Sequence, residues 1–360
     1  MAQPSPESAA GRLSGRELQN GWRVPDRVPR PPGATGGMFS VGYHVESADE
    51  RKGFLKALDI GAALLLSPTD PTRVLEQMLK AYNFECDLLA KCSERHFDRV
   101  MVPLDQGTIQ VDAANPLSVV PYLIFDQAEG DVRGKLSEGG ELDLAWALRT
   151  LHNITVGLLQ LHSVKIAHQD LKPSNVLWFE DAGAMLTDLG RAAARGEPSP
   201  HYDLPIAGDP SYAPPELLYG DVPADWEERR LGCDLYMLGS MVTFFFMSSS
   251  MSALLVAGLP DPDMQPGSWR GRYSELLPTI RLVFSQVLEE LATCLPEDRP
   301  SAERILEAVR QLCDPEPQRR GHPKNILSEG SSYALERYVS MFNLVATRAE
   351  LRLVAPRPRV

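Results

Sequence analysis

The chain has 360 residues, and 43% of them are hydrophobic, which is enough for a sizeable buried core. Its formal net charge of −12 makes the molecule as a whole repel nucleic acid and anionic membrane surfaces, so we expect neither as a partner. The five cysteines show no C-x-x-C spacing, and the first thirty residues contain no apolar leader segment. We therefore expect reduced thiols and a cytoplasmic location.

Residues 1–32 are rich in proline and also carry serine, glycine and arginine. This composition buries little apolar surface, so it predicts a flexible N-terminal extension. Trp22 and Val24 are apolar exceptions, and their docking on the first sheet stays open.

A glycine-rich stretch, residues 33–37, precedes a strand in which Val41, Tyr43 and Val45 alternate with smaller or polar residues. Glycines let the backbone approach phosphates closely, with free N–H groups directed at the ligand. A polar turn then leads to a second strand, residues 54–58, in which Lys56 is the only charged residue. A plain hairpin turn is the alternative interpretation of the glycines.

The segment from Pro71 to Cys92 has apolar residues at helical spacing. Glu85 falls on the same stripe, and a carboxylate on a buried face is costly unless it is paired. We therefore predict an ion pair between Glu85 and Lys56. The alternatives are that Glu85 faces solvent at the edge of the stripe, or that Glu76 is the partner.

Two apolar runs, Val100 to Leu104 and Val119 to Phe125, predict further strands of the same sheet. The polar residues 126–130 end the second run. Leucines then repeat at helical spacing from Leu144 to Leu161.

That helix leads into a compact polar group, His168-Gln-Asp170-Leu-Lys172-Pro-Ser-Asn175, and Asp188-Leu-Gly190 follows. A carboxylate, a lysine and a carboxamide lie within six residues, between apolar runs. Phosphoryl transfer needs such a set, because an acceptor hydroxyl requires a carboxylate, phosphates require cations and Mg²⁺ requires oxygen ligands. A polar turn between two strands is the plainer interpretation.

Residues 235–259 contain no charged residue and are long enough to cross a bilayer. Ser248, Ser249 and Ser250 interrupt this run near its middle, so we favour a buried core helix over a membrane span. After Cys313, a linker rich in proline and arginine precedes a last helical pattern. We expect this last helix to pack on the preceding domain, with binding of a partner as the alternative.

The strings HQDLKPSN, DLG and GDPSYAPPE together resemble the catalytic loop, metal-binding motif and substrate platform of the protein kinase family, in its serine/threonine branch. The resemblance implies an α+β fold with two lobes: a small antiparallel sheet with one key helix over residues 33–128, and a large helical lobe over residues 129–314. Residues 315–360 then form a linker and a C-terminal helical extension. The short loops resemble those of bacterial members.

The resemblance also implies roles for individual residues. Asp170 would be the catalytic base and Lys172 would steady the transferred phosphoryl group, while Lys56, paired with Glu85, would hold the phosphates of ATP. Mg²⁺, or Mn²⁺ in its place, would bind Asn175 and Asp188. The remaining contacts with ATP would come from the glycine loop, the strand after it and the hinge backbone, at Gly36, Gly37, Val41, Asp126 and Ala128.

Several residues depart from the family pattern. Gln169 replaces an arginine that commonly binds an activation-loop phosphate, so we expect activity without phosphorylation of that loop. Asp209 replaces a threonine and is expected to pair with Lys172. Glu216 is expected to pair with Arg299 in a bidentate contact.

The resulting hypothesis is a kinase that transfers the γ-phosphoryl group of ATP to a serine or threonine hydroxyl of a protein. A pseudokinase scaffold that binds ATP is the alternative, favoured by the irregular glycine loop, Leu189 and Asp209. A phosphotransferase for a small molecule is a third hypothesis, which the 208–216 platform disfavours.

Overall fold

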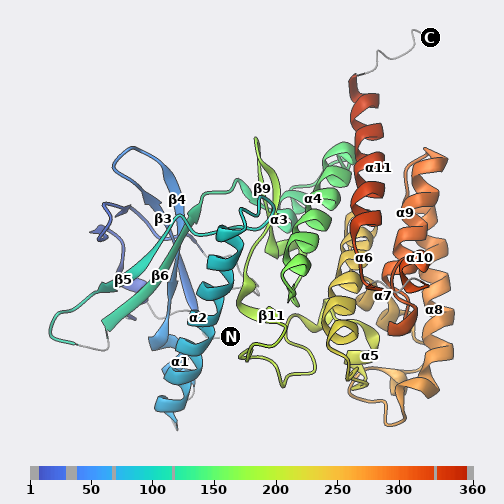
Figure 1. The fold of residues 1–360 in the computed structure, drawn as a ribbon, viewed down its shortest axis with the longest axis horizontal. Coiled ribbons are helices and arrows are strands. Elements are labelled where there is room, and N and C mark those ends of the chain that lie inside the picture. Colours follow the sequence, from blue (N-terminus) through green and yellow to red (C-terminus); the bar gives the residue numbers. More distant parts are fainter. Residues whose placement is uncertain (1–7, 30–38, 67–69, 116–117, 328–330, 355–360) are drawn as a thin grey trace. The chain divides into compact units, whose positions relative to one another are not determined.

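The computed structural model describes residues 8–29, 39–66, 70–115, 118–327 and 331–354. The chain divides into two compact units, the first formed by Met1–His96 with Met101–Glu129 and the second by Phe97–Val100 with Gly130–Val360. The division after Glu129 lies one residue from the boundary expected after residue 128. An antiparallel sheet in the first unit and many helices in the second confirm the predicted α+β class (Figure 1).

The first unit is built on a six-stranded antiparallel sheet with the strand order β1-β2-β3-β4-β6-β5 (Figure 1). Its strands are β1 (Arg16–Glu17), β2 (Arg23–Val24), β3 (Ser40–Glu46), β4 (Lys52–Leu58), β5 (Asp105–Gln110) and β6 (Val119–Asp126). Its described helices are the 3₁₀ turn η1 (Ala10–Arg12), α1 (Ile60–Leu66) and α2 (Pro71–Glu94).

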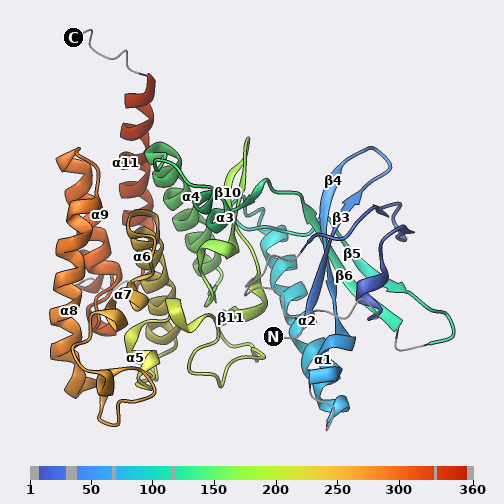
Figure 2. The same cartoon turned by 180° about the vertical axis from the view of Figure 1, so that it is seen from behind.

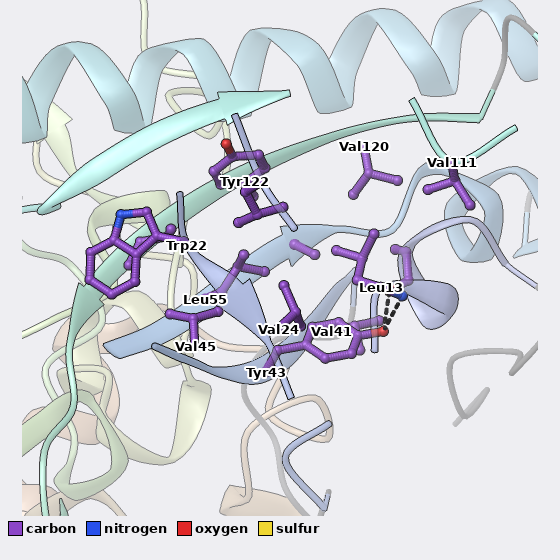
Figure 3. Close-up of a cluster of buried hydrophobic side chains, with 14 residues drawn as sticks. Leu13, Trp22, Val24, Val41, Tyr43, Val45, Leu55, Val111, Val120 and Tyr122 are labelled. Carbon is purple, nitrogen blue, oxygen red and sulfur yellow. Dashed lines mark hydrogen bonds between the residues drawn. The ribbon is translucent and has the colours of Figure 1, made fainter. Parts of the chain in front are cut away.

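One face of this sheet is covered by side chains of residues 8–29, which corrects the prediction of a flexible extension for these residues. The rest of the predicted extension, residues 1–7 and 30–32, lies outside the described residues. Leu13, Leu18, Trp22 and Val24 are buried in a single apolar cluster with side chains of β3, β4 and β6 (Figure 3). The Tyr43 hydroxyl donates to Ala10 O at 2.6 Å. These few apolar side chains, spaced among prolines and polar residues, bury enough surface to order residues 8–29.

Helix α2 begins where the sequence predicted a helix. The Asp70 carboxylate accepts a hydrogen bond from Arg73 N at 3.2 Å, and Pro71 occupies the first turn, where its missing N–H costs nothing. Its buried face carries Phe84, Glu85, Leu88, Leu89 and Cys92.

The strand expected at Val100–Leu104 is wrong, and the strand β5 instead begins at Asp105. Pro103 lies inside the predicted segment and has no N–H for a ladder hydrogen bond. Val100 makes only an isolated bridge to Leu186, while the second predicted strand is present as β6.

The second unit is mainly helical (Figure 2). Its longer helices are α4 (Leu144–Ser163), α6 (Gly232–Met247), α8 (Tyr273–Cys294), α9 (Arg299–Leu312) and α11 (Glu336–Val354). Shorter helices are α3 (Val132–Ser137), α5 (Pro215–Leu218), α7 (Met251–Ala257), α10 (Pro323–Ile326) and the π-helical turn η6 (Glu227–Leu231).

Short strands flank the predicted catalytic loop within this unit. Strands β9 (Val176–Phe179) and β10 (Gly183–Leu186) form a hairpin, and β7 (Gly130–Asp131) completes a three-stranded sheet. A second pair joins β8 (Ile166–Ala167) to β11 (Ala193–Ala194). The loop containing Asp170 therefore begins and ends at strands whose positions are fixed by pairing.

Helix α6 forms the buried centre of the second unit, since most of its residues on every side are buried. It ends at Met247, and the next residue, Ser248, has a left-handed φ of 57°. Helix α7 then begins at Met251, with Ser250 as its N-cap. Among the described residues no single helix is long and apolar enough to cross a membrane. The segments Glu227–Met247 and Met251–Ala257 meet that test only as a pair bent by 74°.

The C-terminal helix α11 packs along α4, as the favoured interpretation predicted (Figures 1 and 2). Arg149 Nε and Nη2 donate to the two carboxylate oxygens of Glu350 at 2.7 and 2.8 Å. His152 Nδ1 lies 3.2 Å from Val339 O, so this nitrogen carries the proton and donates. Buried Phe342, Val345 and Ala346 supply the apolar part of the contact face of α11.

Candidate active site

A single buried carboxylate holds the beginning of the predicted catalytic loop. Asp234, from the first turn of α6, accepts hydrogen bonds from His168 N at 2.7 Å and Gln169 N at 2.8 Å. Its Oδ2 also lies 2.9 Å from His162 Nε2. Burial by itself would raise the pKa of Asp234, but these donors outweigh it and lower the pKa below its ordinary value. The loop is thus bonded through its own backbone to the central helix.

The contacts of His168 indicate a structural role. Its ring is fully buried, and Nδ1 accepts a hydrogen bond from Asp170 N at 3.3 Å. Nε2 must therefore carry the proton and donate to Thr187 O, 3.1 Å away. The ring joins the loop to the strand that precedes Asp188.

The Asp170 carboxylate is held by three donors. Oδ2 accepts from Asn175 Nδ2 at 3.0 Å and lies 3.0 Å from Lys172 Nζ, while Oδ1 accepts from Asp209 N at 2.7 Å. Gly208 permits this last contact, because a Cβ there would come within 2.3 Å of Gln169 O and 2.6 Å of Asp170 Oδ1. The carboxylate is 8% exposed, so its orientation is fixed and only a small part of it meets solvent.

Lys172 lies between two carboxylates. Besides Asp170, its ammonium group is 3.7 Å from Asp209 Oδ2, which confirms the predicted pairing of Lys172 with Asp209. The lysine side chain is 6% exposed. An ammonium group buried this far needs negative partners, and the two aspartates supply them.

The donor set around Asn175 and Asp188 fits a divalent cation. Asn175 Nδ2 donates to Asp170 O at 2.8 Å and to Asp170 Oδ2, so the amide is oriented by its nitrogen. Oδ1 has no hydrogen-bond partner among the described residues and remains available as a hard oxygen ligand. Asp188 has a left-handed φ of 62° and supplies the carboxylate. Neither here nor elsewhere in the described chain does a group of three or more His, Cys, Asp or Glu side chains form a metal site, so the fit rests on these two oxygen donors.

In the first unit, the predicted ion pair between Lys56 and Glu85 is present. Lys56 Nζ donates to the two oxygens of Glu85 at 2.8 and 3.2 Å. Glu85 is buried on α2 and Lys56 is partly buried on β4, as expected for an acid and a base that were each predicted on an apolar face.

Val41 is wrong as a nucleotide contact. It pairs with Ala57 in the β3–β4 register, points to the face opposite Lys56 and is only 2% exposed. Gly42 is the residue opposite Lys56. The Phe54 ring covers Gly42 so closely that a Cβ at residue 42 would lie 2.8 Å from two ring atoms. The face that carries Lys56 therefore presents an aromatic ring where the sequence suggested an aliphatic residue.

The other predicted nucleotide contacts stay predictions. Gly36 and Gly37 lie outside the described residues. Asp126 ends β6, and its carboxylate accepts from Arg51 Nη2 at 2.7 Å. Ala128 lies in the segment without regular structure that follows β6.

The buried partner of Glu216 is Arg320, which corrects the prediction of Arg299. The two nitrogens Nη1 and Nη2 of Arg320 each donate to one Glu216 oxygen at 2.9 Å, and both side chains are almost fully buried. Arg299 is 87% exposed and pairs with Glu303 one helical turn away. The position of Arg299 in the sequence thus did not identify the partner of Glu216. The sequence offers no simple signal that Arg320 is the buried arginine.

These features agree with the similarity of the chain to known proteins. Residues 117–320, more than half of the chain, match the protein kinase domain family. The chain therefore belongs to the protein kinase domain family.

Individual relatives are distant serine/threonine kinases from eukaryotes and bacteria. The chain is 30% identical over 183 residues to serine/threonine-protein kinase 36 of Pongo abelii, covering 50% of this chain and 13% of that protein. It is 26% identical over 200 residues to human serine/threonine-protein kinase H1, covering 52% of this chain and 43% of that protein. It is 24% identical over 209 residues to probable serine/threonine-protein kinase pknA2 of Bifidobacterium longum, covering 58% and 24%. The chain thus spans less than half the length of these three relatives.

Proposed function

We propose that this member of the protein kinase family is an ATP-dependent kinase that transfers the γ-phosphoryl group to a serine or threonine hydroxyl of a protein. The observation that carries this proposal is the Asp170 carboxylate, which Asn175, Lys172 and the Asp209 N–H hold in one orientation. A carboxylate fixed in this way suits a general base, because its oxygen can accept the proton of an acceptor hydroxyl as the new bond forms.

The other site residues have roles that follow from their charges. Lys172 places a cation 3.0 Å from Asp170, where negative charge on a transferring phosphoryl group would be stabilised. Asn175 and Asp188 would hold Mg²⁺ or Mn²⁺, and the charge of the cation would neutralise the negative charge of the nucleotide phosphates. Lys56, oriented by Glu85, would bind those phosphates directly.

A protein acceptor is supported by the segment from Gly208 to Glu216. Asp209 N bonds to Asp170, and Glu216 is bonded to the buried Arg320, so both ends of this segment are fixed. Such a surface next to the candidate base suits an extended polypeptide better than a small metabolite. The names of the similar kinases, and a lysine two residues after Asp170, support serine or threonine over tyrosine.

A pseudokinase that binds ATP is the second candidate, and two observations favour it. The Asp209 carboxylate, 3.7 Å from Lys172, competes with a phosphoryl group for the lysine. The Phe54 ring on Gly42 changes the surface beside Lys56 on which a nucleotide would bind.

The test is transfer of labelled γ-phosphate from ATP with Mg²⁺ to a generic basic protein and, in parallel, to a panel of hydroxylated metabolites. Asp170→Ala is the inactive variant, and Asp263→Ala, an exposed aspartate of the same unit, is the matched control. We expect label on protein with the wild type and the control only. Stabilisation by Mg-ATP without label would support the pseudokinase, and label on metabolites alone would contradict a protein acceptor.

A further inference from the structure

The side chain of Gln169 lies between a buried cation and a buried anion. Its Oε1 accepts from Arg230 Nη1 at 3.0 Å, and its Nε2 donates to Arg230 O at 2.8 Å and to Asp234 Oδ1 at 3.2 Å. The amide dipole thus has its oxygen toward Arg230 and its nitrogen toward Asp234. Arginine at residue 169 would meet Arg230 with like charge, and glutamate would meet Asp234, so the neutral amide suits both neighbours.

Arg230 is buried without a carboxylate partner. Its residue is 1% exposed, and the described residues include no ion pair to Arg230 or to its neighbour Arg229. Burial, and then the charge of Arg229, lower the pKa of Arg230 below its ordinary value. A buried guanidinium that has only neutral acceptors costs stability, so its presence here points to a function.

Apart from Gln169 Oε1, the neutral acceptors of both arginines belong to one segment. Arg230 Nη2 donates to Tyr202 O at 2.8 Å, and Arg229 Nη2 donates to Tyr202 O at 3.1 Å and to Leu204 O at 2.8 Å. Both guanidinium groups also lie over the Tyr202 ring, 5.7 and 5.8 Å from its centre. The two arginines therefore hold residues 202–204 through two backbone oxygens and the Tyr202 ring.

This segment continues directly to the candidate base. Five residues after Leu204, Asp209 N donates to Asp170 Oδ1 at 2.7 Å. Gln169 is also bonded through the chain to Asp170. Arg230 is thus connected to the Asp170 carboxylate by two short routes, one through Gln169 and one through the segment 202–209. Both arginines lie in the π-helical turn η6, a geometry that is rare and frequent at functional sites.

We propose that Arg230 is a positioning residue for phosphoryl transfer. It holds the segment 202–209 and the Asp170 carboxylate in position, and it does so without a phosphate group on that segment. This inference rests on the proposed function for its kinetic consequence. Its structural consequence, the ordering of residues 202–209, is independent of catalysis and can be measured separately.

The experiment compares Arg230→Gln, Arg230→Lys and Tyr202→Leu with Arg270→Gln, an exposed arginine of the same unit, as the control. Hydrogen exchange of the amides of residues 202–209 is measured beside kcat and the KM for ATP, and the wild type is also tested after phosphatase treatment. Tyr202 is 50% exposed, so Tyr202→Leu tests the ring contact in a variant that is expected to fold.

We expect Arg230→Gln to speed exchange of the segment and to lower kcat about tenfold or more, equivalent to about 1.4 kcal/mol, with the KM for ATP changed less than about twofold. Arg230→Lys should recover part of the loss, and Tyr202→Leu should speed exchange to a smaller extent. Phosphatase treatment should leave kcat unchanged.

Exchange and kcat equal to the wild type in Arg230→Gln, with intact folding, would overturn the inference. Loss of activity on phosphatase treatment would overturn it as well. If Arg230→Gln fails to fold, the same comparison is decided by Arg230→Lys and Tyr202→Leu, and unchanged exchange in both would overturn it. A wild type that transfers no phosphate would contradict the proposed function, while faster exchange in the variants would still support the role of Arg230 in ordering the segment.

Discussion

The two units hold their candidate functional residues in different ways. In the second unit, Asp170 and Asp234 each have several hydrogen-bond partners, and nearly all of these side chains are buried. In the first unit, the face of the sheet around Lys56 is defined by one ion pair to Glu85 and by the Phe54 ring on Gly42. The residues around Asp170 and Asp234 are therefore fixed by many contacts, whereas the face around Lys56 depends on one ion pair and one aromatic ring.

This difference matches the extent of the family similarity. The matched residues, 117–320, include the whole catalytic loop but begin after Lys56 and Glu85. The chemistry proposed for Asp170 requires fixed geometry, because a small displacement of a reacting group is costly. A surface that binds a nucleotide by its shape can exchange one apolar side chain for another. We therefore expect substitutions in the second unit to have larger effects than those in the first.

The largest loss of stability is expected from Arg320→Ala. Removing one partner of a buried ion pair leaves Glu216 charged and unpaired, which costs about 3–5 kcal/mol. Arg299→Ala is the matched control and should change the free energy of unfolding by less than about 0.5 kcal/mol, because Arg299 is exposed. Urea denaturation of both variants measures the difference. Equal effects would contradict the assignment of Arg320 as the partner of Glu216.

An intermediate effect is expected from Gly42→Val in the first unit. The new Cβ would lie 2.8 Å from the Phe54 ring, and overpacking of this kind costs about 1–3 kcal/mol. Adding Phe54→Ala removes the obstacle, so the double variant should be more stable than the sum of the two single changes predicts. Unfolding of the three variants gives the coupling energy, expected at about 0.5–3 kcal/mol. Additive effects would show that the ring and Gly42 are not in contact.

The smallest effect concerns pH. Burial, and then the charge of Arg191, lower the pKa of His201 from 6.5 to about 4 in the folded chain. Between these values the unfolded chain binds a proton that the folded chain does not, so stability falls as the pH decreases from about 6.5 to about 4. His201→Gln removes this contribution. Its Tm should therefore fall less than that of the wild type between pH 7 and pH 5, and parallel curves would contradict the prediction.

The sequence was sufficient for those parts of the site in which a local pattern carries the chemistry. The string from His168 to Asn175 is a single loop, so its residues are close whatever surrounds them. The pairing of Lys56 with Glu85 was predictable over a long distance because each lies on an apolar face and needs a counterion.

The predictions that proved wrong concern residues for which packing determines burial and the direction of the side chain. Val41 and Gly42 differ by one residue, and in a strand one residue changes the face to which a side chain points. Leu13 and Trp22 lie in a proline-rich segment whose mean composition hides them, yet both are buried against the sheet. Arg320 is one of several arginines near the end of the matched region, and only the folded chain distinguishes it by burial.

The most direct test of the account is the separation of binding from transfer in Asp170→Asn, measured beside Lys56→Ala. Affinity for Mg-ATP and the rate of phosphoryl transfer at saturating ATP are determined for both variants and the wild type. We expect Asp170→Asn to keep the affinity within about twofold but to transfer phosphate about 10²–10⁴-fold more slowly, because a neutral amide cannot accept the proton. Lys56→Ala should weaken binding of the nucleotide. Transfer by Asp170→Asn at the rate of the wild type would contradict the central role of this carboxylate.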